Sequence, residues 1–433
     1  MRGLFAVVLC LALPVQAMAG GIVLDDEFSA YCQTLVAPLR PKLPHTETVS
    51  FVLVADDSLN AFVTPENVVH VHAGLVAQAK GSNDIQGVLA HELGHVSSQH
   101  LFKVHDNLKT AMLTGIAGAV VGVGAAVAGA PQVAAAAITT GQAGAVAQML
   151  RYSRTQEQEA DQRAIAALHG AGLSAKGMVN TFEKLRVEGQ LSYGSIPQYL
   201  LTHPLPQARL QSLQHAVEKE TASSTDDRTF PRMQAKVYAL THSPNATLRK
   251  YTGNETPARY AQALARLAQG RFDEAAALTS SLLKETPNDP YYQEVAAQIA
   301  LQRGDVAGAV QGFGKIVQAH PKLPLIRYQL GNALLALGKP AEALPHFRQI
   351  TQDWRVWAEP WRGMGLAYGQ TGKLALSHLS LAQAAIYSAD LTEARQQLNF
   401  AKNFLNKTPD AAAQGWADDL TAFLDRTDTS QAN

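Results

Sequence analysis

The sequence predicts an α+β domain followed by an all-α domain of repeated helix pairs. Between about residues 22 and 217, β-rich stretches at 49–54 and 68–72 alternate with stretches of helical periodicity. Beyond about residue 257 the composition becomes helical and a 34-residue period appears. A chain of 433 residues is long enough to fill two hydrophobic cores.

Three stretches of the first domain have helical periodicity, at 84–99, 157–168 and 175–186. In the first of them an apolar stripe follows one helix face, formed by Ile85, Val88, Leu89 and Val96. Asn83 or Asp84 is expected to cap the start of this helix. Helices mixed with separate strands in this way are typical of an α+β domain.

The 34-residue period of the second domain is clearest in its turn glycines, Gly270, Gly304, Gly338 and Gly372. Small residues recur seven positions before and five positions after these glycines: Ala263, Ala297, Gly331, Gly365, Ala275, Ala309, Ala343 and Ser377. Small side chains let antiparallel helices approach closely, and Pro287 and Pro321 are expected to end the second helix of two repeats. The pattern resembles the tetratricopeptide repeat.

The first 19 residues have the layout of a cleaved signal peptide. Arg2 precedes an apolar run from Leu4 to Val15, and Ala17-Met18-Ala19 is a small-x-small cleavage site. A membrane anchor would need about 20 apolar residues, more than this run contains. Cleavage would remove Cys10 and leave Cys32 alone, so the mature fold must be held by packing and not by an internal disulfide.

The segment 111–150 contains no charged residue and is dominated by Ala, Gly and Val. Its length would permit a membrane span, but Gly and Ala contribute little transfer energy and Pro131 divides the run. Two interpretations stay open. The segment is either a lid or membrane-contacting hairpin near the catalytic cleft, or a small-residue helix pair buried in the core.

Charge excludes one class of partner. Lys+Arg and Asp+Glu both number 36, so the chain has no net charge that would favour nucleic acid or an anionic membrane surface. No nucleic-acid partner is expected, and partner choice must depend on local features.

The chemistry is concentrated in residues 91–95, which read HELGH. On a helix His91 and His95 lie on one face, so both can direct a ring nitrogen at a single metal ion. Glu92 lies beside them, where it could accept a proton from an attacking water, as the H-E-x-x-H spacing requires. The competing interpretation is a helix that carries two histidines by chance.

A zinc site of this kind needs a third protein ligand. The metzincin extension is absent, since Val96-Ser97-Ser98 follows His95. His100 should lie about 140° round the helix from His95 and be solvated. Glu157 is the better candidate, with Asp161 four residues later as a hydrogen-bond partner for a ligand histidine. Glu159 is the weaker choice because it lies on another face of that helix.

Three ordered motifs give a family resemblance: HELGH at 91–95, SRTQEQEAD at 153–161 and THPLPQAR at 202–209. They resemble the gluzincin metallopeptidases of the HtpX and CAAX-prenyl-protease type. The resemblance covers nearly the whole mature chain. It implies a zincin-like metalloprotease domain, α+β in class, followed by the all-α tetratricopeptide-repeat solenoid.

The resemblance also implies roles for individual residues. His91, His95 and Glu157 would bind one Zn²⁺ per chain. Glu92 would act as general base, and Asp161 would orient a ligand histidine. The histidine of the third motif, His203, would lie near the metal, where it can act as an extra, inhibitory ligand. Arg209 belongs to the same motif.

The family pairs extended substrate with an edge strand, and Asn60, Ala61 and Phe62 followed by residues 68–72 look like that element. Pro65-Glu66-Asn67 stands where relatives carry glycines, although Asn67 can still adopt a left-handed turn. His70 and His72 share a strand face, and a packed or solvated face is favoured over a second metal site.

The predicted organisation is a signal peptide (1–19), a zinc metalloprotease domain (20–225), a linker (226–257), a repeat domain (258–405) and a polar, frayed tail (406–433). The resemblance implies a periplasmic endopeptidase, associated with the outer membrane, that acts on misfolded or stalled envelope proteins and assists their assembly. Its expected partners are such proteins and the outer-membrane barrel assembly machinery, with peripheral membrane contact through 111–150. The alternative is a non-proteolytic chaperone or adaptor that binds clients through the repeats.

Overall fold

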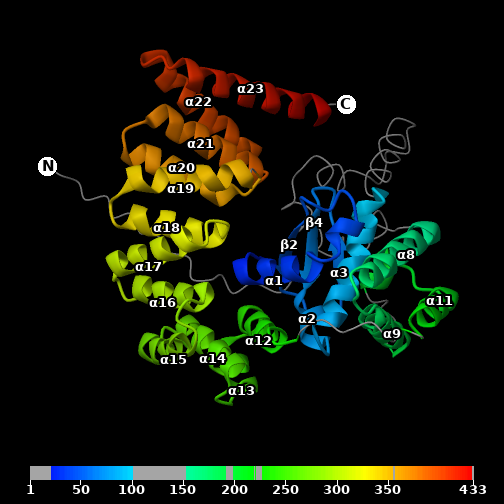
Figure 1. Cartoon of the computed structure of the whole chain (residues 1–433). Helices are drawn as coiled ribbons and strands as arrows, with labels where there is room; N and C mark the ends of the chain where they lie inside the picture. Colours follow the sequence, from blue (N-terminus) through cyan, green and yellow to red (C-terminus); the bar gives the residue numbers. More distant parts are fainter. Residues whose placement is uncertain are drawn as a thin grey trace. The chain divides into compact units, whose positions relative to one another are not determined.

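The computed structural model of the chain describes residues 21–100, 153–191, 198–218, 220, 227–354 and 356–431. Two compact units divide between Arg271 and Phe272 (Figure 1), here called the N-terminal and C-terminal units. The predicted signal peptide (1–19) and the charge-free segment (111–150) lie outside the described residues. No helix within the described residues is both long enough and apolar enough to cross a membrane.

A four-stranded mixed sheet forms one part of the N-terminal unit. Its strands are β1 (Ile22–Val23), β2 (Ser50–Val54), β3 (Ala61–Val63) and β4 (Val68–His72), in the order β1-β2-β4-β3. β2 and β4 are parallel, and β1 and β3 run antiparallel to their neighbours. The strands predicted at 49–54 and 68–72 are confirmed, and β3 forms one edge of the sheet.

The turn between β3 and β4 depends on Asn67, which has a φ of 59°. The amide of Asn67 donates to Thr64 O at 2.9 Å, and the amide of Thr64 donates to Val68 O at 3.0 Å. Asparagine tolerates this left-handed conformation better than most residues, so the tight turn forms without glycine, as the sequence predicts.

Ten α-helices and one short 3₁₀ helix complete the described part of the N-terminal unit. The α-helices are α1 (Asp26–Val36), α2 (Ala73–Gln78), α3 (Ser82–Ser97), α8 (Arg154–Gly170), α9 (Lys176–Leu191), α10 (Gln198–Thr202), α11 (Gln207–Val217), α12 (Phe230–Thr241), α13 (Pro244–Lys250) and α14 (Thr256–Ala268), and the 3₁₀ helix spans Arg40–Lys42. The three predicted helices are confirmed as α3, α8 and α9. Helix α3 is central and packs against α1, α8, α9 and β3, with its predicted apolar stripe buried.

The start of α3 is capped by a distant residue. Its N-cap, Gly81, offers no side chain, and Asn83 and Asp84, the expected caps, lie inside the helix. Instead, Asp227 accepts a hydrogen bond from the amide of Ser82 at 2.6 Å. A carboxylate at a helix N-terminus satisfies an otherwise unpaired N–H group and interacts favourably with the helix dipole.

We expect Asp227→Ala to lower the free energy of unfolding of the N-terminal unit by about 1 kcal/mol, because α3 loses its only described side-chain cap. Chemical denaturation of the full chain would measure the change. Asp57→Ala removes an exposed aspartate of the same unit and is the matched control. Equal stability of the two variants would show that the Asp227 cap contributes nothing.

The sequence predicts a linker at 226–257, and the described part of that range, residues 227–257, is largely helical. They contain α12 and α13, and Phe230, Met233 and Val237 of α12 belong to the core of the N-terminal unit. Lys236, also buried, binds the carboxylates of Asp25 and Glu27 at 2.7 and 3.0 Å. The apolar residues of α12 are three and four positions apart, so they share one helix face. This face packs into the core of the N-terminal unit.

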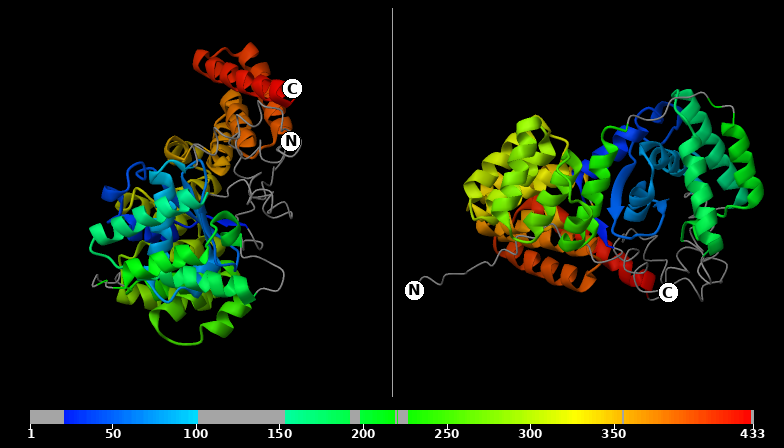
Figure 2. Two further views of the ribbon diagram at one scale, coloured as in Figure 1. Left: turned by 90° about the vertical axis from the view of Figure 1, so that its right-hand side faces the viewer. Right: turned by 90° about the horizontal axis from the view of Figure 1, so that it is seen from below.

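The C-terminal unit consists of antiparallel helix pairs. They are α15 (Phe272–Glu285), α16 (Pro290–Gln302), α17 (Val306–Ala319), α18 (Pro324–Ala336), α19 (Pro340–Asp353), α20 (Ala358–Gln370), α21 (Leu374–Tyr387), α22 (Leu391–Lys407) and α23 (Ala411–Gln431). Figures 1 and 2 show α16 to α22, yellow to orange-red, following one another as stacked hairpins. The four predicted turn glycines have φ between 73° and 84°, which explains their 34-residue spacing.

Close helix packing explains the small residues of the repeat. A Cβ on Gly331 would lie 2.7 Å from the Phe347 ring, and one on Gly365 would lie 2.8 Å from Leu381 Cγ. The sequence predicts a frayed tail at 406–433, whereas the described residues 411–431 form α23, which buries Ala413, Ala417, Leu420 and Leu424 against α21 and α22. These four residues are three or four positions apart, so they form one apolar helix face, which covers the end of the helix stack.

Candidate metal centre

Two neighbouring helices and one loop place the candidate ligands. His91, Glu92 and His95 lie on α3, Glu157 lies on α8, and His203 follows α10. The helices can approach because Gly94 faces α8: a Cβ there would lie 2.7 Å from the carbonyl oxygen of Ala160. The glycine of HELGH therefore brings the Glu157 carboxylate within reach of the two imidazoles.

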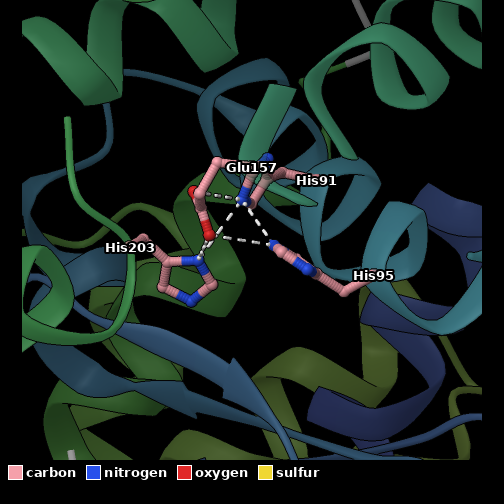
Figure 3. Close-up of side chains that lie close together, drawn as sticks. All are labelled: His91, His95, Glu157 and His203. Carbon is pink, nitrogen blue, oxygen red and sulfur yellow. Dashed lines mark hydrogen bonds and ion pairs between the residues drawn. The ribbon is translucent and has the colours of Figure 1, made fainter. Parts of the chain in front are cut away.

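Four side chains converge in the interior of the N-terminal unit: His91, His95, Glu157 and His203 (Figure 3). All four are fully buried, and one ligand atom from each lies within 4.8 Å of the others. His91 Nε2 is 3.1 Å from His95 Nε2 and 3.4 Å from His203 Nδ1. Glu157 Oε1 is 3.4 Å from His95 Nε2 and 3.0 Å from His203 Nδ1.

These separations fit a four-coordinate metal ion. A tetrahedral ion bound at about 2.0–2.1 Å to each ligand keeps its ligand atoms about 3.3–3.4 Å apart, close to the four separations of 3.0–3.4 Å given above, within a group whose ligand atoms all lie within 4.8 Å. Imidazole and carboxylate are also ligands that zinc accepts. The arrangement therefore fits a small divalent cation of that type.

Asp161 and Arg209 hold His91 and Glu157 in place. Asp161 Oδ1 lies 2.9 Å from His91 Nδ1, so the imidazole directs Nε2 toward the other ligands. Burial alone would lower the pKa of His91, but the adjacent Asp161 and Glu157 carboxylates outweigh it and raise the pKa to about 9. Buried Arg209 donates two hydrogen bonds to Asp161, at 2.6 and 2.8 Å, and its Nη1 lies 2.5 Å from Glu157 Oε2.

The buried ionisable groups around the site include more carboxylates than cationic side chains. The described residues around the site supply the carboxylates of Glu92, Glu157 and Asp161 and the single guanidinium of Arg209. With these carboxylates ionised and the histidines neutral, as metal binding requires, the groups carry a net charge of −2, and uncompensated buried charge is strongly unfavourable. A divalent cation would neutralise it.

Glu92 is fully buried beside the ligands, and neither of its carboxylate oxygens accepts a hydrogen bond from any described residue. Its nearest ionic neighbour is His203, whose Nε2 lies 3.6 Å from Oε1. Burial raises the pKa of Glu92 above its ordinary value. A carboxylate with free acceptor capacity and a raised pKa is well suited to proton transfer near neutral pH.

His100 corrects a sequence expectation. It is fully buried, not solvated, and its Nδ1 lies 2.9 Å from His95 Nδ1. The helical extrapolation fails because α3 ends at Ser97 and Gln99 takes a φ of 54°, which turns the chain back toward the site. Glu159, the weaker ligand candidate, binds Ser98 and His100 instead of the ligand group.

Tyr199 was not singled out from the sequence. Its buried ring stacks on the His203 imidazole, with ring centroids 4.4 Å apart and 21° between the planes. The stack restricts the orientation of His203. The four-residue spacing from Tyr199 to His203 could have indicated that the two rings are neighbours. This indication is weak, because α10 has only five residues and ends before His203.

The predicted substrate strand lies at the expected edge. β3 contains Ala61 and Phe62 but not Asn60, and it packs beside α3, the helix that carries the metal ligands. Phe62 pairs with His70 in register and stacks on it at 4.7 Å. His72 is buried and contacts Ser58, and the described residues contain no second group of metal-ligand side chains.

A helix-borne pair of histidines, completed by a glutamate from a second helix of an α+β domain, defines a metallopeptidase of the gluzincin class. Residues 30–217 match the model of peptidase family M48, and residues 260–324 match a tetratricopeptide-repeat model. The N-terminal unit therefore carries a peptidase family M48 domain, and tetratricopeptide repeats follow it in the chain.

Several curated proteases are similar to this chain. The chain is 26% identical over 407 residues to the beta-barrel assembly-enhancing protease of Yersinia pestis, covering 86% of this chain and 83% of the relative. It is 29% identical over 306 residues to the Escherichia coli (strain K12) protein of that name, covering 68% and 62%. The metalloprotease YcaL of Escherichia coli is 28% identical over 39% of this chain and 62% of its own length. The matches to the two Escherichia coli proteins thus span less than two thirds of those relatives.

Proposed function

We propose that this chain is a periplasmic, zinc-dependent endopeptidase that acts on misfolded or stalled outer-membrane and other envelope proteins. The observation that carries the proposal is the buried convergence of His91, His95 and Glu157 beside the carboxylate of Glu92, whose oxygens accept no hydrogen bond from the described residues. The name of two similar proteins, beta-barrel assembly-enhancing protease, supports the substrate class. The signal-peptide layout of residues 1–19 agrees with export.

The chain's own residues divide the chemistry between them. His91, His95 and Glu157 would hold one zinc ion, which supplies Lewis acidity and lowers the pKa of water. Glu92 accepts the proton of the attacking water and delivers it to the leaving amine. Asp161 keeps His91 in the tautomer that offers Nε2, and Arg209 fixes both carboxylates of α8.

The edge strand β3 explains how substrates of unrelated sequence could be held. Within the described sheet β3 pairs on one side only, with β4, so backbone groups on its other side can bond an extended peptide. Such backbone hydrogen bonds do not depend on the side chains of the peptide, so peptides of different sequence can bind in the same way. Because β3 packs beside α3, a peptide added there would lie near the helix that carries Glu92.

His203 supplies the restraint that a sequence-tolerant protease needs. Catalytic zinc sites keep three protein ligands and one open position, whereas four protein ligands close the site. With Nδ1 at 3.0 Å from Glu157 Oε1 and 3.4 Å from His91 Nε2, His203 would supply a fourth protein ligand to an ion held by the other three. We propose that this arrangement is the resting state and that His203 must move away before substrate binds.

We expect His203→Ala to cleave a misfolded outer-membrane protein faster than the wild type, with unchanged zinc content. The reason is that three ligands remain and the fourth position opens. His215→Ala, which removes a histidine whose side chain is 84% exposed, is the matched control. Unchanged cleavage with unchanged zinc would contradict the inhibitory role.

The proposed activity itself is tested with the purified mature chain and a casein-type substrate. Chelation is expected to abolish cleavage, and one equivalent of zinc is expected to restore it. Cleavage that survives complete removal of metal, or a chain that purifies without zinc and does not bind it, would overturn the proposal.

A further inference from the structure

We propose that His100 is a positioning residue of the metal centre, which holds His95 in the tautomer that directs a lone pair from Nε2 toward the metal. The inference rests on the proposed zinc site. It starts from a contact that the sequence did not indicate, the 2.9 Å separation of His95 Nδ1 and His100 Nδ1 in the interior of the N-terminal unit.

The direction of this hydrogen bond follows from the other side of the His100 ring. His100 Nε2 lies 3.3 Å from Oε2 of Glu159. An ionised carboxylate only accepts hydrogen bonds, so Nε2 carries the proton, and Nδ1 of a neutral His100 is left as an acceptor. His95 must then donate from Nδ1, which leaves its Nε2 free of hydrogen and able to bind a metal.

Glu159 is itself held as an ionised acceptor. Ser98 Oγ donates to Oε1 at 2.7 Å, and Arg163 donates to the same oxygen through Nε and Nη2 at 3.2 Å each. His100 is therefore fixed at both ring nitrogens.

The two ligand histidines of α3 are thus supported by different partners. The Nδ1 atom of His91 contacts the carboxylate of Asp161, whereas the Nδ1 atom of His95 contacts the imidazole of His100. A carboxylate in place of His100 would orient His95 equally well, but it would add one more negative charge to a buried site that already holds three carboxylates. A histidine supplies the orientation without that charge.

The test compares two substitutions of His100 by competition titration of zinc against a chromophoric chelator. His100→Phe keeps a ring but offers no acceptor, and we expect zinc affinity to fall 10- to 100-fold, as for other partners of metal ligands. His100→Gln can accept through Oε1 and donate through Nε2, and it should stay within a few-fold of the wild type. His215→Phe is the control at an exposed histidine.

A second measurement keeps the inference testable if His100→Phe does not fold. Nitrogen chemical shifts of the metal-free wild type report which ring nitrogen of His95 carries the proton. A proton on Nδ1 supports the inference, and a proton on Nε2 overturns it. Wild-type zinc affinity in a folded His100→Phe variant would also overturn it.

Failure of the proposed function would look different. A wild-type chain that binds no zinc would refute the peptidase proposal, while the tautomer of His95 would still decide whether His100 orients it.

Discussion

Substitution of Glu92 by glutamine is expected to lower kcat/KM for peptide cleavage by a factor of about 10² to 10⁴ while zinc content stays that of the wild type. The amide has the shape of the carboxylate but cannot accept the proton of the attacking water. Zinc retention is expected because Glu92 is not among the four converging ligand groups. Cleavage rates and metal content of the same preparation measure both effects.

The same variant separates the peptidase from a chaperone or adaptor that works through its repeats. Loss of cleavage together with loss of biological rescue supports the enzyme. Complete rescue by a Glu92→Gln chain that no longer cleaves would instead favour the non-proteolytic alternative. Full cleavage by the variant would remove Glu92 from the mechanism.

Substitution of Arg209 by methionine is expected to lower the free energy of unfolding of the N-terminal unit by about 3–5 kcal/mol. Arg209 is buried and bonds Asp161 and Glu157 together, so its loss leaves two buried carboxylates without their common cation. Without Arg209, the pKa of Asp161 should rise toward its ordinary value. Chemical denaturation in the presence of chelator measures the change in stability.

Arg249→Met is the matched control, since Arg249 is exposed on α13 of the same unit and its loss should change stability by less than about 1 kcal/mol. Excess zinc should recover part of the stability of Arg209→Met, because the metal supplies positive charge to the same carboxylates. Equal stability of the Arg209 and Arg249 variants would contradict the assigned role of Arg209.

The sequence predicted those parts of the site that depend on local periodicity. Residues four apart on a helix share a face, so the pairing of His91 with His95 and of Glu157 with Asp161 could be predicted from spacing alone. The position of His203 beside these residues could not be predicted from spacing, because tertiary packing places the loop after α10. It was expected only from the family resemblance.

The prediction failed where chain direction changes. His100 was placed by continuing an ideal helix, whereas the left-handed Gln99 turns the chain at the end of α3. The polar composition around residue 226 concealed α12, whose role depends on buried contacts with α1 that no local pattern reveals. The cap of α3 by Asp227 is likewise a contact across 145 residues.

Anomalous diffraction at the zinc absorption edge, from crystals of the mature chain, tests the central claim most directly. The predicted result is one peak per chain, about 2.0–2.2 Å from Nε2 of His91, Nε2 of His95 and one carboxylate oxygen of Glu157. A map with no peak among these three side chains, in crystals grown with zinc, would contradict the metallopeptidase account.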